Sequence, residues 1–294
     1  MTGYLQIEEY HRPQDMAQAV DIFSRFRNSA RVIAGGTDIL PKRPGVKRIA
    51  HIDHLVDISD LDLDYLKTEN GHICIGAAIS INRIAESPLL FSSAYDALSE
   101  AANAHSTTTI RNRATIGGNL CNASPCADLA LPLLVLDAIL VAAGPEGKRE
   151  IPSASFFKGP NYTALNNGEI LKEIRIPLCH EKTGTSFLKL RRHQTAIDMA
   201  LVNVATSLTL EKERCKAARI ALGSVGPIPF RAKEAESLLT KAKFNNEVIE
   251  KAASKAAEEA SPIDDVRATA VYRRKMVEVL VRRSLEKSLK RCGQ

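Results

Sequence analysis

The chain has 294 residues, of which 45% are hydrophobic and 25% charged, and its formal net charge at pH 7 is +6. This is the composition of an ordinary globular protein with enough length for two domains. It is not typical of a nucleic-acid-binding protein, because the charge excess is modest, Trp is absent and the basic residues are not interleaved with aromatic ones.

The sequence contains no segment typical of export or membrane insertion. The first 13 residues lack the apolar core of a signal peptide. The most apolar run, residues 129–143, is interrupted by Pro132 and Asp137 and is too short to cross a bilayer. We therefore expect a cytoplasmic protein that does not insert into a membrane.

The N-terminal third predicts a small α/β unit. Apolar residues at helical spacing predict a helix over 15–26, and apolar runs predict strands over 31–34 and 48–58. The first of these strands leads into the segment Ile33-Ala34-Gly35-Gly36-Thr37-Asp38. A glycine pair lets the backbone turn with positive φ, and successive N–H groups in such a turn favour an anion such as phosphate.

A second glycine segment, Thr115-Ile116-Gly117-Gly118-Asn119, lies further along the chain. It follows a strand predicted over 72–79 and a helix predicted from Pro88 to about Ala104. Two such loops could hold the two phosphates of a dinucleotide. Neither fits the G-x-x-x-x-G-K-[ST] phosphate loop or the G-x-G-x-x-G fingerprint.

The remaining pattern predicts a domain boundary at residues 177–184. Before it we expect a helix over 128–136 and strands over 138–142 and 169–176. After it come strands predicted over 185–191, 201–210 and 217–225, which would form a small antiparallel sheet. Helices are predicted over 231–239, 246–260 and 266–290. The basic residues of the last helix would line a solvated face or a surface for an acidic partner.

The six cysteines do not indicate a metal centre. None forms a C-x-x-C pair, so a zinc site is not expected. Cys121 and Cys126 match the first interval of a plant-type iron–sulfur motif, but the third cysteine is missing. Scattered thiols suit a reducing cytosol.

Two longer stretches carry a family resemblance. Ile110-Arg111-Asn112-Arg113-Ala114 runs directly into the second glycine segment, and Ala123-Ser124-Pro125-Cys126-Ala127-Asp128-Leu129 follows it. Further matches lie at residues 168–171, 187–192 and 263–267. With the first glycine segment, these stretches resemble the FAD-binding medium subunit of the molybdenum hydroxylases, a group that includes the xanthine dehydrogenase and carbon monoxide dehydrogenase families. The resemblance spans nearly the whole chain.

The resemblance implies an α+β fold with two domains. Residues 1–177 would form a PCMH-type FAD-binding domain, made of a small α/β unit and a larger unit with a mixed sheet. Residues 184–290 would form a smaller α+β domain that resembles the C-terminal domain of the carbon monoxide dehydrogenase flavoprotein. It would contain a three-stranded antiparallel sheet and helices.

The resemblance also implies which residues bind FAD. Backbone N–H groups of both glycine segments would receive the pyrophosphate, and Asp128 would accept a hydrogen bond from a hydroxyl of FAD. Lys189 would stabilise the negative charge of reduced flavin at its N1–C2=O edge, Leu171 would pack by the ring, and His105 would stack on it. The implied set is Ile33, Ala34, Gly35, Gly36, Thr37, Asp38, Ile39, Leu40, His105, Thr115, Ile116, Gly117, Gly118, Asn119, Asn122, Asp128, Leu171 and Lys189. No catalytic residue or metal ligand is expected in this chain.

Three of these residues have simpler alternative roles. Asp128 could cap the helix that begins after it. Lys189 could stand on the solvent face of its strand, as alternation alone suggests. His105 could simply end a helix.

The resemblance implies an oxidoreductase subunit that transfers electrons. In the family, a molybdopterin-binding large subunit hydroxylates the substrate, and a small subunit with 2Fe–2S clusters passes the electrons to FAD, which reduces NAD+ or another acceptor. We expect both partners, assembled as a dimer of heterotrimers, and neither nucleic acid nor membrane. A stand-alone FAD oxidoreductase would need a further substrate domain, for which the roughly 110 residues after Pro177 leave little room. The other alternative is a nucleotide-binding scaffold subunit without redox turnover.

Overall fold

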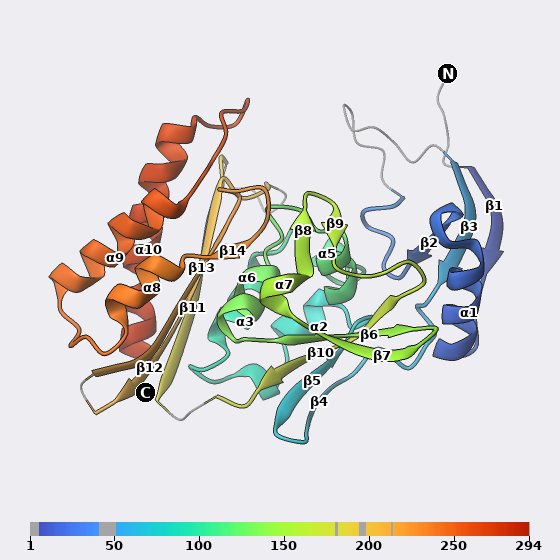
Figure 1. Cartoon of the computed structure of the whole chain (residues 1–294), viewed down its shortest axis with the longest axis horizontal. Helices are drawn as coiled ribbons and strands as arrows, with labels where there is room; N and C mark the ends of the chain where they lie inside the picture. The colour runs from blue at the N-terminus through green and yellow to red at the C-terminus, as the bar shows by residue number, and fades with distance from the viewer. Residues whose placement is uncertain (1–5, 41–50, 180–181, 194–197, 213, 294) are drawn as a thin grey trace.

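The computed structural model describes residues 6–40, 51–179, 182–193, 198–212 and 214–293. Within these ranges, three larger sheets follow one another across the molecule, each with helices packed against it (Figure 1). Both helices and strands are present throughout, as the α+β prediction requires. No helix in these ranges is both long enough and apolar enough to cross a membrane.

The N-terminal unit is a three-stranded parallel sheet with α1 (Met16–Phe26) beside it. Its strand order is β1 (Gln6–His11), β3 (His51–Asp57), β2 (Ala30–Ile33). Asp15 caps α1 by accepting a hydrogen bond from the N–H of Gln18, at 2.8 Å. The predicted helix and strands are confirmed, although residues 48–50 of the second predicted strand lie outside the described ranges. The edge strand β1 is exposed and mostly polar, so no apolar run revealed it.

The middle unit contains a five-stranded sheet. Its order is β4 (Leu66–Glu69), β5 (His72–Gly76), β10 (Ile170–Pro177), β6 (Ile139–Gly144), β7 (Gly147–Pro152). Every pair in it is antiparallel, whereas the resemblance implied a mixed sheet. Tight hairpins account for two of these pairs. Asn70 and Gly71 both have positive φ, as a two-residue hairpin turn requires.

Short helices cover this sheet. They are α2 (Ile81–Ala85), α3 (Asp96–Ala104), α4 (Thr108–Arg111), α5 (Ile116–Cys121), α6 (Ala130–Val135) and α7 (Ser153–Phe156), followed by the small hairpin β8 (Phe157–Gly159) and β9 (Tyr162–Thr163). The prediction of one helix from Pro88 to Ala104 is wrong. A single 3-10 turn, Pro88–Leu90, ends at Phe91, whose ψ of 67° leaves helical geometry, and α3 begins only at Asp96.

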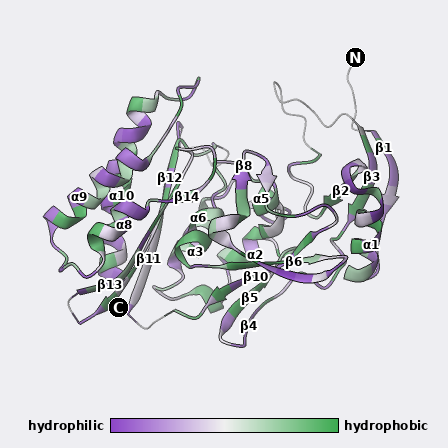
Figure 2. Cartoon of the chain, viewed as in Figure 1, coloured by the Kyte–Doolittle hydropathy of each residue, from purple (hydrophilic) through white to green (hydrophobic). Residues whose placement is uncertain are grey.

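The C-terminal unit has a four-stranded antiparallel sheet rather than the three-stranded one expected. Its strands are β11 (Thr183–Leu190), β12 (Val202–Glu211), β13 (Arg214–Gly223) and the two-residue β14 (Phe230–Arg231). Helices α8 (Lys233–Leu239), α9 (Asn246–Glu259) and α10 (Ala270–Arg291) pack on one side of this sheet (Figure 1). Hydrophilic and hydrophobic residues alternate along α9 and α10, as expected for helices with one buried face (Figure 2).

The other side of the C-terminal sheet packs directly on the middle unit. Phe187, Ala205 and Ala221 of this sheet are buried in the same hydrophobic core as α3 and α6. At the edge of this contact, Glu100 of α3 pairs with Lys287 and Arg291 of α10, at 2.7 and 2.6 Å. Burial opposes ionisation of Glu100, but these two cations outweigh it and lower the pKa of the carboxyl. The two parts therefore share a core and a charged rim.

Candidate functional site

The first glycine segment forms a tight loop at the end of β2. Gly36 has φ of 72°, and its carbonyl accepts a hydrogen bond from the N–H of Leu40, at 3.0 Å. Within the described ranges, the N–H groups of Gly35, Gly36 and Thr37 donate to no protein acceptor. Three successive free N–H groups around a residue in the left-handed region make a concavity suited to an anion. This is the loop for which the sequence predicts phosphate binding.

The second glycine segment has a different structure from the one expected. Thr115 is the N-cap of α5, and its hydroxyl accepts the N–H of Gly118. The N–H groups of Ile116, Gly117 and Asn119 donate to the carbonyls of Ile79, Ala77 and Thr115, respectively. The expectation that backbone N–H groups over 116–119 receive a phosphate is therefore not supported, because protein acceptors already use all four. Side chains are what this segment can offer a ligand.

The two glycine segments lie in contact. A side chain on Gly35 would overlap the carbonyl of Arg113, so only glycine allows the first loop to approach the backbone just before the second segment. Arg111, two residues before Arg113, connects this region to the end of α3. The guanidinium of Arg111 donates to the carbonyls of His105 and Ser106, at 3.4 and 3.2 Å, and so shapes the chain after α3.

A buried ion pair lies at the boundary between the middle and C-terminal units. Lys189 Nζ of β11 is 2.6 Å from Asp128 Oδ2, and the two side chains are only 6% and 5% exposed. Asn203 of β12, fully buried, donates to the other carboxylate oxygen at 3.1 Å. His105 Nδ1 lies 3.5 Å from Asp128 Oδ2. Three residues that the resemblance placed at the cofactor therefore meet around one carboxylate.

The structure also decides the alternative roles of these residues. Asp128 does not cap α6, whose N-cap is Leu129 with no side-chain hydrogen bond. Lys189 does not face solvent, since its strand face packs toward the middle unit. His105 does end α3, and it also lies beside Asp128. Alternation is a poor guide for Lys189 because the middle unit covers that face of its strand. Capping preference is a poor guide for Asp128 because its carboxylate accepts from Lys189 and Asn203 instead.

Two buried polar atoms of the candidate residues have no hydrogen-bond partner among the residues that the structure describes. They are His105 Nδ1 and Asn119 Oδ1. Arg191 Nε is also unpaired, while another nitrogen of the same guanidinium donates to the carbonyl of Ala104 at 2.5 Å. Buried polar atoms are normally paired in folded proteins, so unpaired ones on the candidate residues are available to a bound group.

Other candidate residues lie around this region in less specific settings. Asn122 ends α5, and Leu171 is buried in β10 within the main core. Asp38 is exposed on the loop that follows Gly36. The sequence reasoning missed Asn203 and the role of Arg111. A polar residue inside the apolar run of β12 was the available signal for Asn203, whereas nothing local indicated that Arg111 would bind carbonyls.

Comparisons with known proteins show the family to which this chain belongs. Residues 5–179 match the family model described as the FAD binding domain in molybdopterin dehydrogenase, and residues 185–288 match the CO dehydrogenase flavoprotein C-terminal domain. The chain is 31% identical to the carbon monoxide dehydrogenase medium chain of Hydrogenophaga pseudoflava, covering 97% of this chain and 98% of the relative. It is 28% identical to a putative xanthine dehydrogenase FAD-binding subunit of Escherichia coli, covering 97% of each.

A solved structure leads to the same conclusion about the fold. The reconstituted CO dehydrogenase from Oligotropha carboxidovorans contains a chain that superimposes with a TM-score of 0.90 at 32% identity. The match covers 96% of this chain and 98% of the other.

The residues in place fit the chemistry of FAD. The free N–H groups of 35–37 suit its pyrophosphate, and unpaired Asn119 Oδ1 suits one of its hydroxyl or ring N–H donors. The carboxylate of Asp128 suits a hydroxyl, and Lys189 suits a ring edge that becomes negative on reduction.

Proposed function

This chain belongs to the family of FAD-binding medium subunits of the molybdenum hydroxylases, and from that premise we propose its role in electron transfer. It is an oxidoreductase subunit with an FAD-binding domain. The proposed role is to accept electrons from 2Fe–2S clusters of a small subunit and to pass them through FAD to NAD+ or another acceptor. FAD supplies the conversion between single electrons and electron pairs.

The Lys189–Asp128 pair is the observation that supports this role most strongly. A buried ammonium stabilises negative charge in its surroundings far more than an exposed one does, because little water screens it. Asp128 holds the ammonium in place, and Asn203 holds Asp128 from the other side. A subunit that only bound a nucleotide for assembly would have no need of this buried cation. The arrangement therefore favours redox tuning over the scaffold alternative.

We propose that the remaining candidate residues have different roles in binding FAD. The N–H groups of Gly35, Gly36 and Thr37 bind the pyrophosphate, and Ile33, Ala34, Asp38, Ile39 and Leu40 form the rest of that loop. At the second segment, Thr115 and Asn119 act through side chains, while Ile116, Gly117 and Gly118 set the position of α5. His105, Asn122 and Leu171 complete the proposed set around the flavin.

The proposed partners are a molybdopterin-binding large subunit and a 2Fe–2S small subunit, assembled as a dimer of heterotrimers. The similarity to proteins that are themselves medium chains supports this proposal. We propose a cytoplasmic location, since all six cysteines are free thiols.

The test is the visible absorption spectrum of the chain purified with its neighbouring subunits, recorded anaerobically. The expected result is flavin and iron–sulfur absorbance that substrate bleaches and NAD+ or another acceptor restores. Flavin that the reduced iron–sulfur clusters cannot reduce would contradict electron transfer and leave the scaffold role. Recovery by an acceptor other than NAD+ would identify that acceptor.

A further inference from the structure

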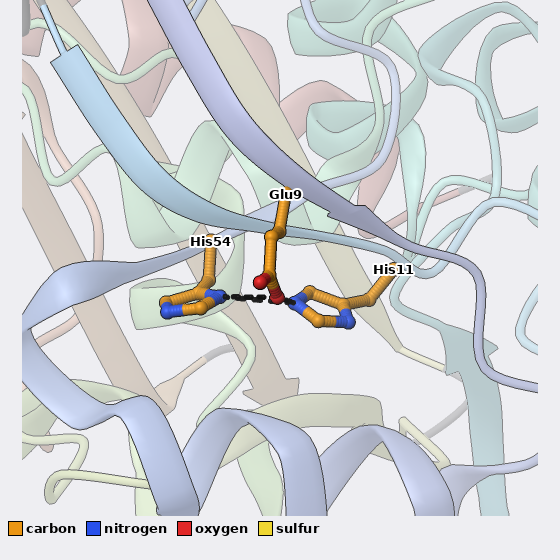
Figure 3. Close-up of side chains that lie close together, drawn as sticks. All are labelled: Glu9, His11 and His54. Atoms are coloured by element: carbon orange, nitrogen blue, oxygen red, sulfur yellow. Dashed lines mark hydrogen bonds and ion pairs between the residues drawn. The ribbon is translucent and has the colours of Figure 1, made fainter.

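Two histidines and a glutamate that are not among the proposed FAD-binding residues converge on one face of the N-terminal sheet. They are Glu9 and His11 of β1 and His54 of β3 (Figure 3). Because side chains alternate along a strand, Glu9 and His11 lie on one face. The parallel register pairs Glu9 with His54, which brings the third side chain to the same face. The backbone alone thus gathers the three groups.

The three potential ligand atoms form a nearly equilateral triangle. His11 Nε2 and His54 Nδ1 are 3.1 Å apart, and Glu9 Oε2 lies 3.2 Å from His54 Nδ1 and 3.5 Å from His11 Nε2. In a tetrahedral zinc site, with ligands about 2.0–2.1 Å from the ion, neighbouring ligand atoms are roughly 3.3 Å apart. The triangle therefore has the dimensions of one face of such a tetrahedron.

The imidazoles are also held in place before any ion binds. His54 stacks on Phe26 of α1 with ring centroids 3.5 Å apart, and His11 stacks on the same ring at 5.6 Å. The side chains of His11 and His54 are only 20% and 16% exposed, whereas that of Glu9 is 59% exposed. The two largely buried imidazoles and the exposed carboxylate leave the site open to an ion from solvent.

From this geometry we propose that Glu9, His11 and His54 bind a divalent transition metal ion, Zn2+ in the first instance, with water as the fourth ligand. Two imidazoles and one carboxylate are a donor set that zinc accepts with an open fourth position. The ion would tie the edge strand β1 to the central strand β3, next to β2, which leads into the first glycine loop. Its effect would be to stabilise the unit that carries that loop.

The test uses the full chain without an affinity tag, stripped of metal with a chelator and titrated with Zn2+ against a chromophoric competitor. One equivalent of Zn2+ should bind with a Kd below about 1 µM. The affinity should be lower than that of a structural zinc site, because three protein ligands hold the ion instead of four. Binding of Co2+ should give the intense visible bands of tetrahedral coordination. Zinc should also raise the melting temperature of the chain.

Two variants and a control make the result decisive. His54→Gln and Glu9→Gln should each weaken Zn2+ binding by at least about 100-fold, more than the loss of an outer hydrogen-bond partner would. Glu9→Gln keeps the fold intact because its side chain is mostly exposed. His72→Gln, at a histidine outside the cluster, should change nothing. Equal Zn2+ binding by wild type and Glu9→Gln, or no Zn2+ binding by wild type, would overturn the proposal and leave a hydrogen-bonded histidine pair.

Discussion

The buried pair between Lys189 and Asp128 makes a sharp energetic prediction. Lys189→Met leaves the Asp128 carboxylate, only 5% exposed, with Asn203 as its one remaining hydrogen-bond donor among the described residues. Removing one member of a buried pair costs about 3–5 kcal/mol, because the other charge stays buried without compensation. Asp128→Asn leaves the Lys189 ammonium without its counter-charge, facing only neutral acceptors such as the carbonyl of Ala104 at 3.5 Å, and should cost a similar amount.

The double variant Asp128→Asn with Lys189→Met should be much less harmful than the sum of the two single changes. Replacing a whole buried pair with neutral groups of similar size is often nearly neutral. The coupling energy of the cycle should therefore reach about 2–3 kcal/mol. The measurement is urea unfolding of the flavin-free full chain, followed by far-UV circular dichroism because the chain has no Trp.

The exposed pair Glu247–Lys251 on α9 provides a matched control. Its side chains are 70% and 66% exposed at a separation of 2.6 Å, so the distance equals that of the buried pair while the burial does not. A cycle on this pair should show a coupling of no more than about 0.5 kcal/mol. If the Lys189–Asp128 cycle were equally close to additive, the argument that burial strengthens this pair would be wrong.

Three further outcomes follow from the structure. In the FAD-loaded complex, Lys189→Met should lower the two-electron flavin potential by up to about 90 mV, since one charge about 4 Å from the ring edge is worth about 4 kcal/mol at an effective dielectric constant near 20. An unchanged potential in a dye-equilibrated redox titration would contradict this role. Gly35→Ala should weaken FAD binding at least about tenfold in a flavin-fluorescence titration, because the added methyl overlaps the Arg113 carbonyl. The control Gly159→Ala, whose methyl would meet only Tyr162 Cβ at an ordinary 3.9 Å, should bind FAD normally. Burial raises the pKa of the Asp265 carboxyl, but the N–H groups of Arg267 and Ala268 and the guanidinium of Arg273 outweigh it and lower the pKa to about 2 from an ordinary 3.8. The stabilisation from Asp265 is therefore complete above pH 3.8 and is lost as the pH falls toward 2. Asp265→Asn should reduce the loss of unfolding free energy across that window by about 1–2 kcal/mol after solvent screening, and an unchanged slope would refute this.

The spacing of apolar residues along the chain predicted most helices and strands that have one apolar face. Helix 15–26 and the strands on either side of the domain boundary were found within a few residues. The pattern failed where burial is weak or where a turn interrupts an apolar run. The exposed strand Gln6–His11 carries no apolar alternation, and the break after Leu90 depends on the backbone angles of Phe91.

The site was predictable as a set of residues but not as a set of interactions. The resemblance named Asp128, Lys189 and His105, and the structure brings them together. It could not show that the N–H groups of the second glycine segment are already used, because their acceptors at Ala77 and Ile79 lie some 40 residues earlier in the chain. Contacts between distant segments also hid the buried position of Arg273, one of the basic residues for which the sequence predicts a solvated face or a surface for an acidic partner.

A crystal structure of the chain with FAD bound would test the account most directly. The account predicts that pyrophosphate oxygens lie within hydrogen-bond distance of the N–H groups of Gly35, Gly36 and Thr37, with Lys189 Nζ at the N1–C2=O edge of the flavin. A pyrophosphate bound away from residues 35–37, or a flavin ring out of reach of Lys189, would contradict it.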